Sequence, residues 1–72
     1  MKVKIGDTIQ YRKWGDIQPT EAIIEGIEVC KAGTKYGRQV TKCDLSKHQE
    51  VVLDLSDDHW CYKDQVIDII KQ

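Results

Sequence analysis

The sequence predicts an all-β domain. Apolar residues follow the alternation typical of half-buried strands, most clearly in "GDTIQYRK" and "EVVLDLS". The longest apolar run, "EAIIEGIEVCK", is rich in β-branched residues, and glycine, proline and aspartate interrupt the chain at short intervals. A chain of 72 residues has room for one small core, so we treat residues 1–72 as a single domain.

The first expected strand lies within "GDTIQYRK". Ile9 and Tyr11 share one face of this strand, because side chains two residues apart point the same way. The stretch "WGDIQPT" then breaks the alternation with a glycine and a proline, which is typical of a loop.

The second expected strand, "EAIIEGIEVCK", changes its buried face partway along. Ala22 and Ile24 share one face, whereas Ile27 and Val29 share the other. A strand changes its buried face only through a bend or an extra residue, so we predict a bulge at Gly26. One long, bent strand would then serve both sheets of a small barrel. A straight strand buried on both faces is the alternative.

The rest of the chain predicts shorter elements. "RQVTKCDL" has a weak strand pattern, "SKHQ" is a turn, and "EVVLDLS" is a clear strand with Val51, Leu53 and Leu55 on one face. After a tight turn, "WCY" is a short strand, "KDQ" a single helical turn and "VIDII" the last strand. A helix over residues 64–72 is the alternative, because the apolar residues there also fit a helical spacing.

The order of these elements resembles that of SH3-like small barrels, in particular the KOW-like and tudor-like groups. "VVLDLSDDHWCYKDQVIDI" is similar to their ending, in which an aromatic strand leads through a short 3-10 turn to the last strand. "KIGDTIQYRKWGD" resembles their opening, and "EAIIEGI" their bent second strand. The resemblance implies a single barrel of five or six strands. It fails in residues 30–49, which we expect to form an added hairpin or a long loop.

The charges predict two faces of opposite sign. The formal net charge of −1 argues against a dedicated binder of bulk nucleic acid. However, residues 31–47 carry five basic residues and one acid, whereas residues 50–72 carry six acids and two lysines.

The cysteines and the apolar runs give an expectation for the cellular environment. Three cysteines cannot all pair within one chain, and "MKVKIGDTIQ" lacks the apolar stretch of a signal peptide. No apolar run is long enough to cross a membrane. We therefore expect a cytoplasmic protein with free thiols and no membrane partner.

Metal binding and catalysis have little support. The side chains suited to zinc are Cys43, His48, His59 and Cys61. The strand between the two histidines would span about 20 Å, which places them at opposite ends of the barrel. Cys61 with His59 is the only local pair of nucleophile and base, and a cysteine between two aromatic residues is more often a buried packing residue. We predict no metal, no cofactor and no enzymatic activity.

Aromatic residues near two loops form the stronger candidate site. Tyr11 and Trp14 lie where the first strand meets its loop, and Trp60 and Tyr62 follow the turn that contains Asp57 and Asp58. In tudor-like barrels the corresponding loops meet and form an aromatic cage for a methylated cation, so the resemblance implies that chemistry as one option. Aromatic faces attract cations, and nearby carboxylates strengthen the attraction. Alternatively, the two aspartates serve only to hydrogen-bond the turn.

The pairing register decides whether the later aromatics face the core. If the turn pairs Leu55 with Trp60 and Leu53 with Tyr62, all four side chains share the core face, and a shift of one residue reverses this. We expect one of the two aromatics in the core and the other in a partly exposed groove. We also expect Trp60→Ala to unfold the domain, because truncating a buried tryptophan costs about 3–5 kcal/mol.

Together these patterns predict a non-catalytic binding module whose partner is a protein or a peptide. The candidate groove residues are Tyr11, Trp14, Asp57, Asp58, Trp60 and Tyr62. The alternative is a nucleic-acid-binding module that uses the basic stretch 31–47, because basic residues with an interleaved aromatic can follow a phosphate backbone and stack on a base. The candidate contacts there are Lys31, Lys35, Tyr36, Arg38 and Lys42. KOW-like barrels often contact RNA or protein, which is consistent with either partner.

Overall fold

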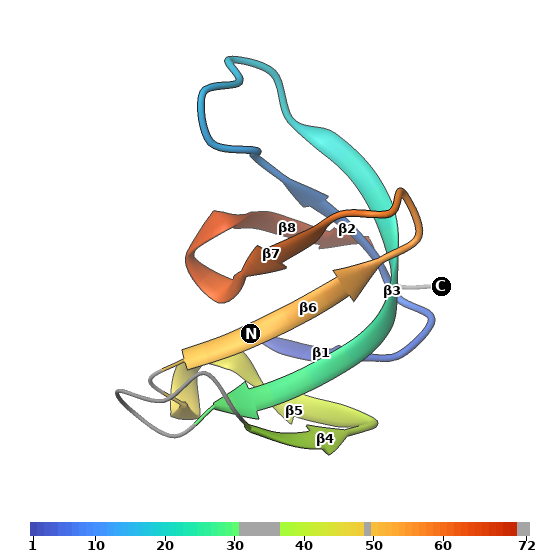
Figure 1. Cartoon of the computed structure of the whole chain (residues 1–72), viewed down its shortest axis with the longest axis vertical. Coiled ribbons are helices and arrows are strands. Elements are labelled where there is room, and N and C mark those ends of the chain that lie inside the picture. Colours follow the sequence, from blue (N-terminus) through green and yellow to red (C-terminus); the bar gives the residue numbers. More distant parts are fainter. Residues whose placement is uncertain (31–36, 49, 71–72) are drawn as a thin grey trace.

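The computed structural model describes residues 1–30, 37–48 and 50–70. These residues form antiparallel strands with two short 3-10 turns, which confirms the all-β prediction (Figure 1). The elements are β1 (Lys2–Lys4), β2 (Thr8–Tyr11), β3 (Thr20–Cys30), β4 (Gly37–Val40), β5 (Lys42–Asp44), η1 (Leu45–Lys47), β6 (Glu50–Leu55), β7 (Trp60–Tyr62), η2 (Lys63–Gln65) and β8 (Val66–Ile70). In the described part of the chain, no helix has the length and apolar character needed to cross a membrane.

The long strand β3 organises the sheet. Its first residues pair with β2, and from Ile24 onward it pairs with β6. The register with β6 shifts between Ile24 and Gly26, so the predicted bulge is confirmed. Ala22 and Ile24 are buried before the bulge, and Ile27 is buried after it. The bulge therefore keeps the apolar side chains of both halves of the strand in one core.

The predicted barrel of five or six strands is not closed by the described residues. The main strand order is β7-β6-β3-β2-β8, and β7 and β8 stand at its two ends without pairing to each other. The side chain of Gln65 instead links the end of β7 to the residue that follows β2: its Oε1 accepts from the Tyr62 amide at 2.9 Å, and its Nε2 donates to the Arg12 carbonyl at 3.0 Å. One side chain thus satisfies a backbone donor at the end of β7 and a backbone acceptor just after β2.

The segment that begins at Gly37 adds two strands. β4 pairs with the end of β3, and β5 pairs with β1. The weak strand pattern of "RQVTKCDL" therefore covers two strands separated by a bend at Thr41. The sequence pattern did not indicate β1, because a three-residue strand is too short to display a period of two.

The end of the chain follows the predicted order. η2 is the expected single helical turn, and the last described residues form β8, which pairs with β2. The alternative of a C-terminal helix is therefore wrong for residues 66–70.

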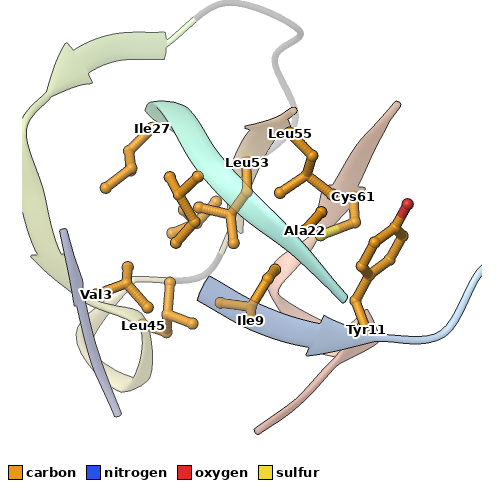
Figure 2. Packing of buried hydrophobic residues seen from close by; sticks show 11 residues of the cluster. Val3, Ile9, Tyr11, Ala22, Ile27, Leu45, Leu53, Leu55 and Cys61 are labelled. Atoms are coloured by element: carbon orange, nitrogen blue, oxygen red, sulfur yellow. The ribbon is translucent and has the colours of Figure 1, made fainter. Parts of the chain in front are cut away.

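The core lies between the curved sheet and the β1–β5 ribbon (Figures 1 and 2). It includes Leu53 and Leu55 from β6 and Ile9 from β2, all at most 2% exposed. Val3 from β1 and Leu45 from η1 cover one side of it, so the added ribbon contributes to the core. The full buried cluster is Val3, Ile9, Tyr11, Ala22, Ile24, Ile27, Leu45, Val51, Leu53, Leu55 and Cys61.

Candidate functional site

The register of the β6–β7 hairpin decides which side chains form the site. The predicted antiparallel pairing of "WCY" with β6 is confirmed, and Leu53 lies opposite Cys61. Cys61 is fully buried, whereas Trp60 is 55% exposed and Tyr62 is half-buried. The prediction that Trp60 or Tyr62 belongs to the core is therefore wrong. The prediction that Cys61 is a packing residue is confirmed.

The turn between the two strands explains this register. The Leu55 amide donates to the His59 carbonyl at 3.0 Å, which closes a loop over residues 56–59. Asp58 has a φ of 64°, a left-handed conformation that aspartate tolerates better than most residues. Asp57 Oδ1 accepts from the His59 amide at 3.2 Å. These local bonds place Cys61, and not Trp60 or Tyr62, on the core face.

Tyr11 is part of the core and not of an open groove. Its side chain is fully buried and lies beside Cys61 (Figure 2), so its place among the groove candidates was wrong. The hydroxyl of Tyr11 donates to Asp57 Oδ2 at 2.5 Å. The bond connects the end of β2 to the β6–β7 turn across 46 positions of the chain.

Asp57 is occupied by bonds within the fold. Besides Tyr11 and the His59 amide, its carboxylate lies 3.9 Å from Lys13 Nζ. Burial alone would raise the pKa of Asp57, but the hydrogen bonds from Tyr11 and the His59 amide, helped by the nearby charges of His59 and Lys13, outweigh burial and lower it. Asp57 is thus a structural residue of the turn, whereas Asp58 is exposed.

The aromatic cluster, which we define as Trp14, Trp60 and Tyr62, lies on the surface. The ring centroids of Trp14 and Tyr62 are 5.9 Å apart at 32°, and those of Trp60 and Tyr62 are 5.2 Å apart at 89°. Trp14 is 78% exposed. Three of the four predicted groove aromatics are therefore brought together, with Tyr62 in contact with both tryptophans.

The aromatic cluster adjoins a hollow of about 220 Å³ beside Trp14 and Tyr62, and two larger hollows. The loop hollow, of about 450 Å³, has acidic, basic and imidazole side chains around the three aromatics: Lys13, Asp16, Asp58 and His59, with Gln65. The sheet hollow, of about 550 Å³, lies over the outer face of β3, β6 and β7. Its described lining residues are Glu28, Cys30, Glu50, Val52, Asp54, Trp60 and Tyr62.

Strand pairing assembles the sheet hollow. Gly26, Asp54 and Trp60 form one cross-strand row on the outer face, and Glu28, Val52 and Tyr62 form the next. The alternation of "EVVLDLS" already placed Glu50, Val52 and Asp54 opposite the apolar face. These three residues were not predicted as site residues, because the sequence does not show that Glu28 and Trp60 lie beside them.

The thiols are poorly suited to nucleophilic chemistry. Burial, followed by the charge of Asp57, raises the pKa of Cys61 to about 12. Burial, then the charges of Glu28 and Glu50, raises the pKa of Cys30. A nucleophile needs its base within hydrogen-bond reach, but Cys61 is buried, His59 is exposed, and no hydrogen bond joins these two described residues. Across residues 1–30, 37–48 and 50–70, no three His, Cys, Asp or Glu side chains are grouped to hold a metal ion.

The basic candidates are only partly described. Lys31, Lys35 and Tyr36 lie outside the described residues, whereas Arg38 in β4 and Lys42 in β5 are exposed. Lys42 lies opposite Lys4, and the exposed Lys2 lies two residues earlier on β1.

No protein-family model, curated protein or solved structure matches the chain.

Proposed function

We propose that this protein is a non-catalytic, SH3-like binding module that recognises a protein or a peptide through the aromatic cluster. The strand order β8-β2-β3-β6-β7, with the 3-10 turn η2 before the last strand, supports the SH3-like assignment. The raised thiol pKa values of Cys30 and Cys61 support a role other than covalent catalysis.

The observation that carries this proposal is the exposure of Trp14 and Trp60 around Tyr62. Tryptophan and tyrosine contribute large contact areas at low entropic cost, and they are enriched among the residues that dominate binding energy. Hollows on two sides of Tyr62 give a partner side chain room to contact the rings. Trp60 also lies outside the core, so its exposed surface is available for a partner.

A pull-down with matched variants tests the proposal. Tagged wild-type protein and the Trp14→Ala and Trp60→Ala variants are incubated with nuclease-treated lysate, and retained proteins are identified by mass spectrometry. Ile17→Ala is the control, because Ile17 is 90% exposed in the same loop as Trp14 but outside the cluster. We expect a partner that both tryptophan variants lose and the control keeps. Equal retention by all four proteins would contradict the proposal.

Nucleic acid is the second candidate partner, supported by the β1–β5 ribbon. Lys2, Lys4 and Lys42 are all exposed there, and Arg38 is exposed on β4. Contacts to phosphates release counterions, so such binding would weaken log-linearly with salt. Lys4→Ala with Lys42→Ala should reduce that salt slope, whereas Trp60→Ala should not. If the affinity for nucleic acid depends neither on the salt concentration nor on Lys4 and Lys42, this candidate function is excluded.

A further inference from the structure

We propose that the sheet hollow recognises an arginine side chain of a partner protein. This inference rests on the proposed binding function and names the kind of residue that the outer face of β3, β6 and β7 selects. It concerns a different surface from the loop hollow, although Trp60 and Tyr62 border both.

The first observation is the charge of the sheet hollow. Glu28, Glu50 and Asp54 are acidic, and no basic residue is among the described side chains that line it. The two ion pairs found between described residues are Met1 with Asp44 and Lys13 with Asp57, so neither neutralises these three carboxylates. In contrast, the loop hollow includes Lys13 beside its aspartates. The sheet hollow is therefore the more favourable of the two for a cation.

The second observation is the arrangement of the carboxylates and the rings. Asp54 lies opposite Trp60 in the ladder, and Gly26, on the other side of Asp54, contributes no side chain that would cover it. Asp54 and Trp60 are both exposed. The Asp54 carboxylate lies over Gly26, where an added Cβ would come within 2.9 Å of its Oδ2, so a cation between the Trp60 ring and Gly26 would have this carboxylate on the neighbouring strand within its reach.

The chemistry of this arrangement favours arginine over lysine. A guanidinium group is planar, stacks on an aromatic ring and offers several N–H donors to a carboxylate at the same time. The rings of Trp60 and Tyr62 meet at 89°, so they form two walls at a right angle. A planar group can lie along one wall and direct its edge toward Asp54, whereas an ammonium group has no plane to stack.

A nuclear magnetic resonance titration of the whole chain tests the inference. The probe is a capped hexapeptide of alternating arginine and glycine at low ionic strength, compared with versions that contain lysine or glutamate. We expect saturable shifts that concentrate on the amides of β6 and β7 and on the Trp60 indole. The arginine peptide should bind more tightly than the lysine peptide, and the glutamate peptide should not bind.

Two charge-neutralising variants make the test specific. Glu50→Gln combined with Asp54→Asn should raise the dissociation constant of the arginine peptide by about tenfold, because charge-assisted hydrogen bonds are lost. Glu21→Gln is the control, since Glu21 is exposed at the other end of β3, and its dissociation constant should stay within about twofold. Circular dichroism verifies that all variants are folded.

Several outcomes would overturn the inference. The titration would contradict it if no binding saturates, if the chemical shifts change only around the loop hollow, or if the lysine peptide binds as tightly as the arginine peptide. Self-association of the protein in which the lysines of the β1–β5 ribbon occupy the sheet hollow would also contradict it. If the pull-down partner depends on Trp14 and Trp60 but not on Glu50 and Asp54, the inference fails while the proposed function stands. If the partner does not depend on the tryptophans either, both fail.

Discussion

The two sides of the β6–β7 hairpin differ sharply although they alternate along the same short strands. On the inner side, Leu53 and Cys61 face each other and are fully buried. On the outer side, Asp54 and Trp60 face each other and are exposed. The inner pair contributes to the small core, whereas the outer pair presents charge and aromatic surface. Under the proposed function, stability and recognition depend on alternate residues of the hairpin, and substitutions should affect one without the other.

The largest expected effect is on the inner side of β6. Leu53→Ala should destabilise the fold by about 2–5 kcal/mol, because it removes buried methyl groups and leaves a cavity. A core of this size supplies roughly 3–5 kcal/mol, so the variant should be largely unfolded. Val52→Ala is the control on the outer side and should cost less than about 1 kcal/mol. Urea titrations followed by circular dichroism measure the free energy of unfolding of both variants. Equal destabilisation by the two substitutions would contradict the difference between the inner and outer sides.

A smaller effect is expected at the inner position of β7. Cys61→Ser should cost about 1–3 kcal/mol, because the hydroxyl group would be buried without an assured hydrogen-bond partner. Cys61→Ala separates this polarity cost from the loss of the sulfur atom. If the serine and alanine variants have the same melting temperature, water or another hydrogen-bond partner reaches the serine hydroxyl, which would contradict the predicted polarity cost.

Tyr11→Phe tests the connection between the core and the turn. We expect a loss of about 1 kcal/mol at pH 7, because a hydrogen bond to the Asp57 carboxylate is removed while water can partly replace it. Folding lowers the pKa of Asp57 below the value of about 3.9 that its carboxyl group has in the unfolded chain. The Asp57 carboxylate therefore stabilises the fold fully above about pH 3.9. This stabilisation is lost as the pH falls through the pKa of Asp57 in the folded protein. The stability difference between wild type and variant should therefore narrow below about pH 4. Urea titrations at pH 7 and pH 3 measure this difference, and a constant gap would contradict the role assigned to the Asp57 charge.

The smallest expected effect on stability is at the outer position of β7. Trp60→Ala should change the free energy of unfolding by less than about 1 kcal/mol, because the side chain is 55% exposed and its main ring contact is with Tyr62 on the same surface. This replaces the expectation from sequence that the variant unfolds. Thermal melts alongside the binding assays should show a folded protein that has lost its partner. If the Trp60→Ala variant is unfolded, Trp60 contributes to the core and its assignment to the surface is wrong.

The sequence determined the elements that repeat a local pattern. Alternation was enough to predict β2 and β6, and the change of phase at Gly26 was enough to predict the bulge in β3. These features depend on which neighbouring side chains avoid water, and that information is local.

Only the tertiary structure decided the partners and the register of the strands. β1 is three residues long and pairs with β5 across about 40 positions of the chain, so no local pattern indicates this pairing. The register of β7 depends on the backbone of one turn residue, Asp58, and on the bonds that Asp57 makes. A shift of one residue would have exchanged the inner and outer sides of β7. The candidate site therefore consists of residues that the sequence displays, on a surface that long-range pairing and turn geometry select.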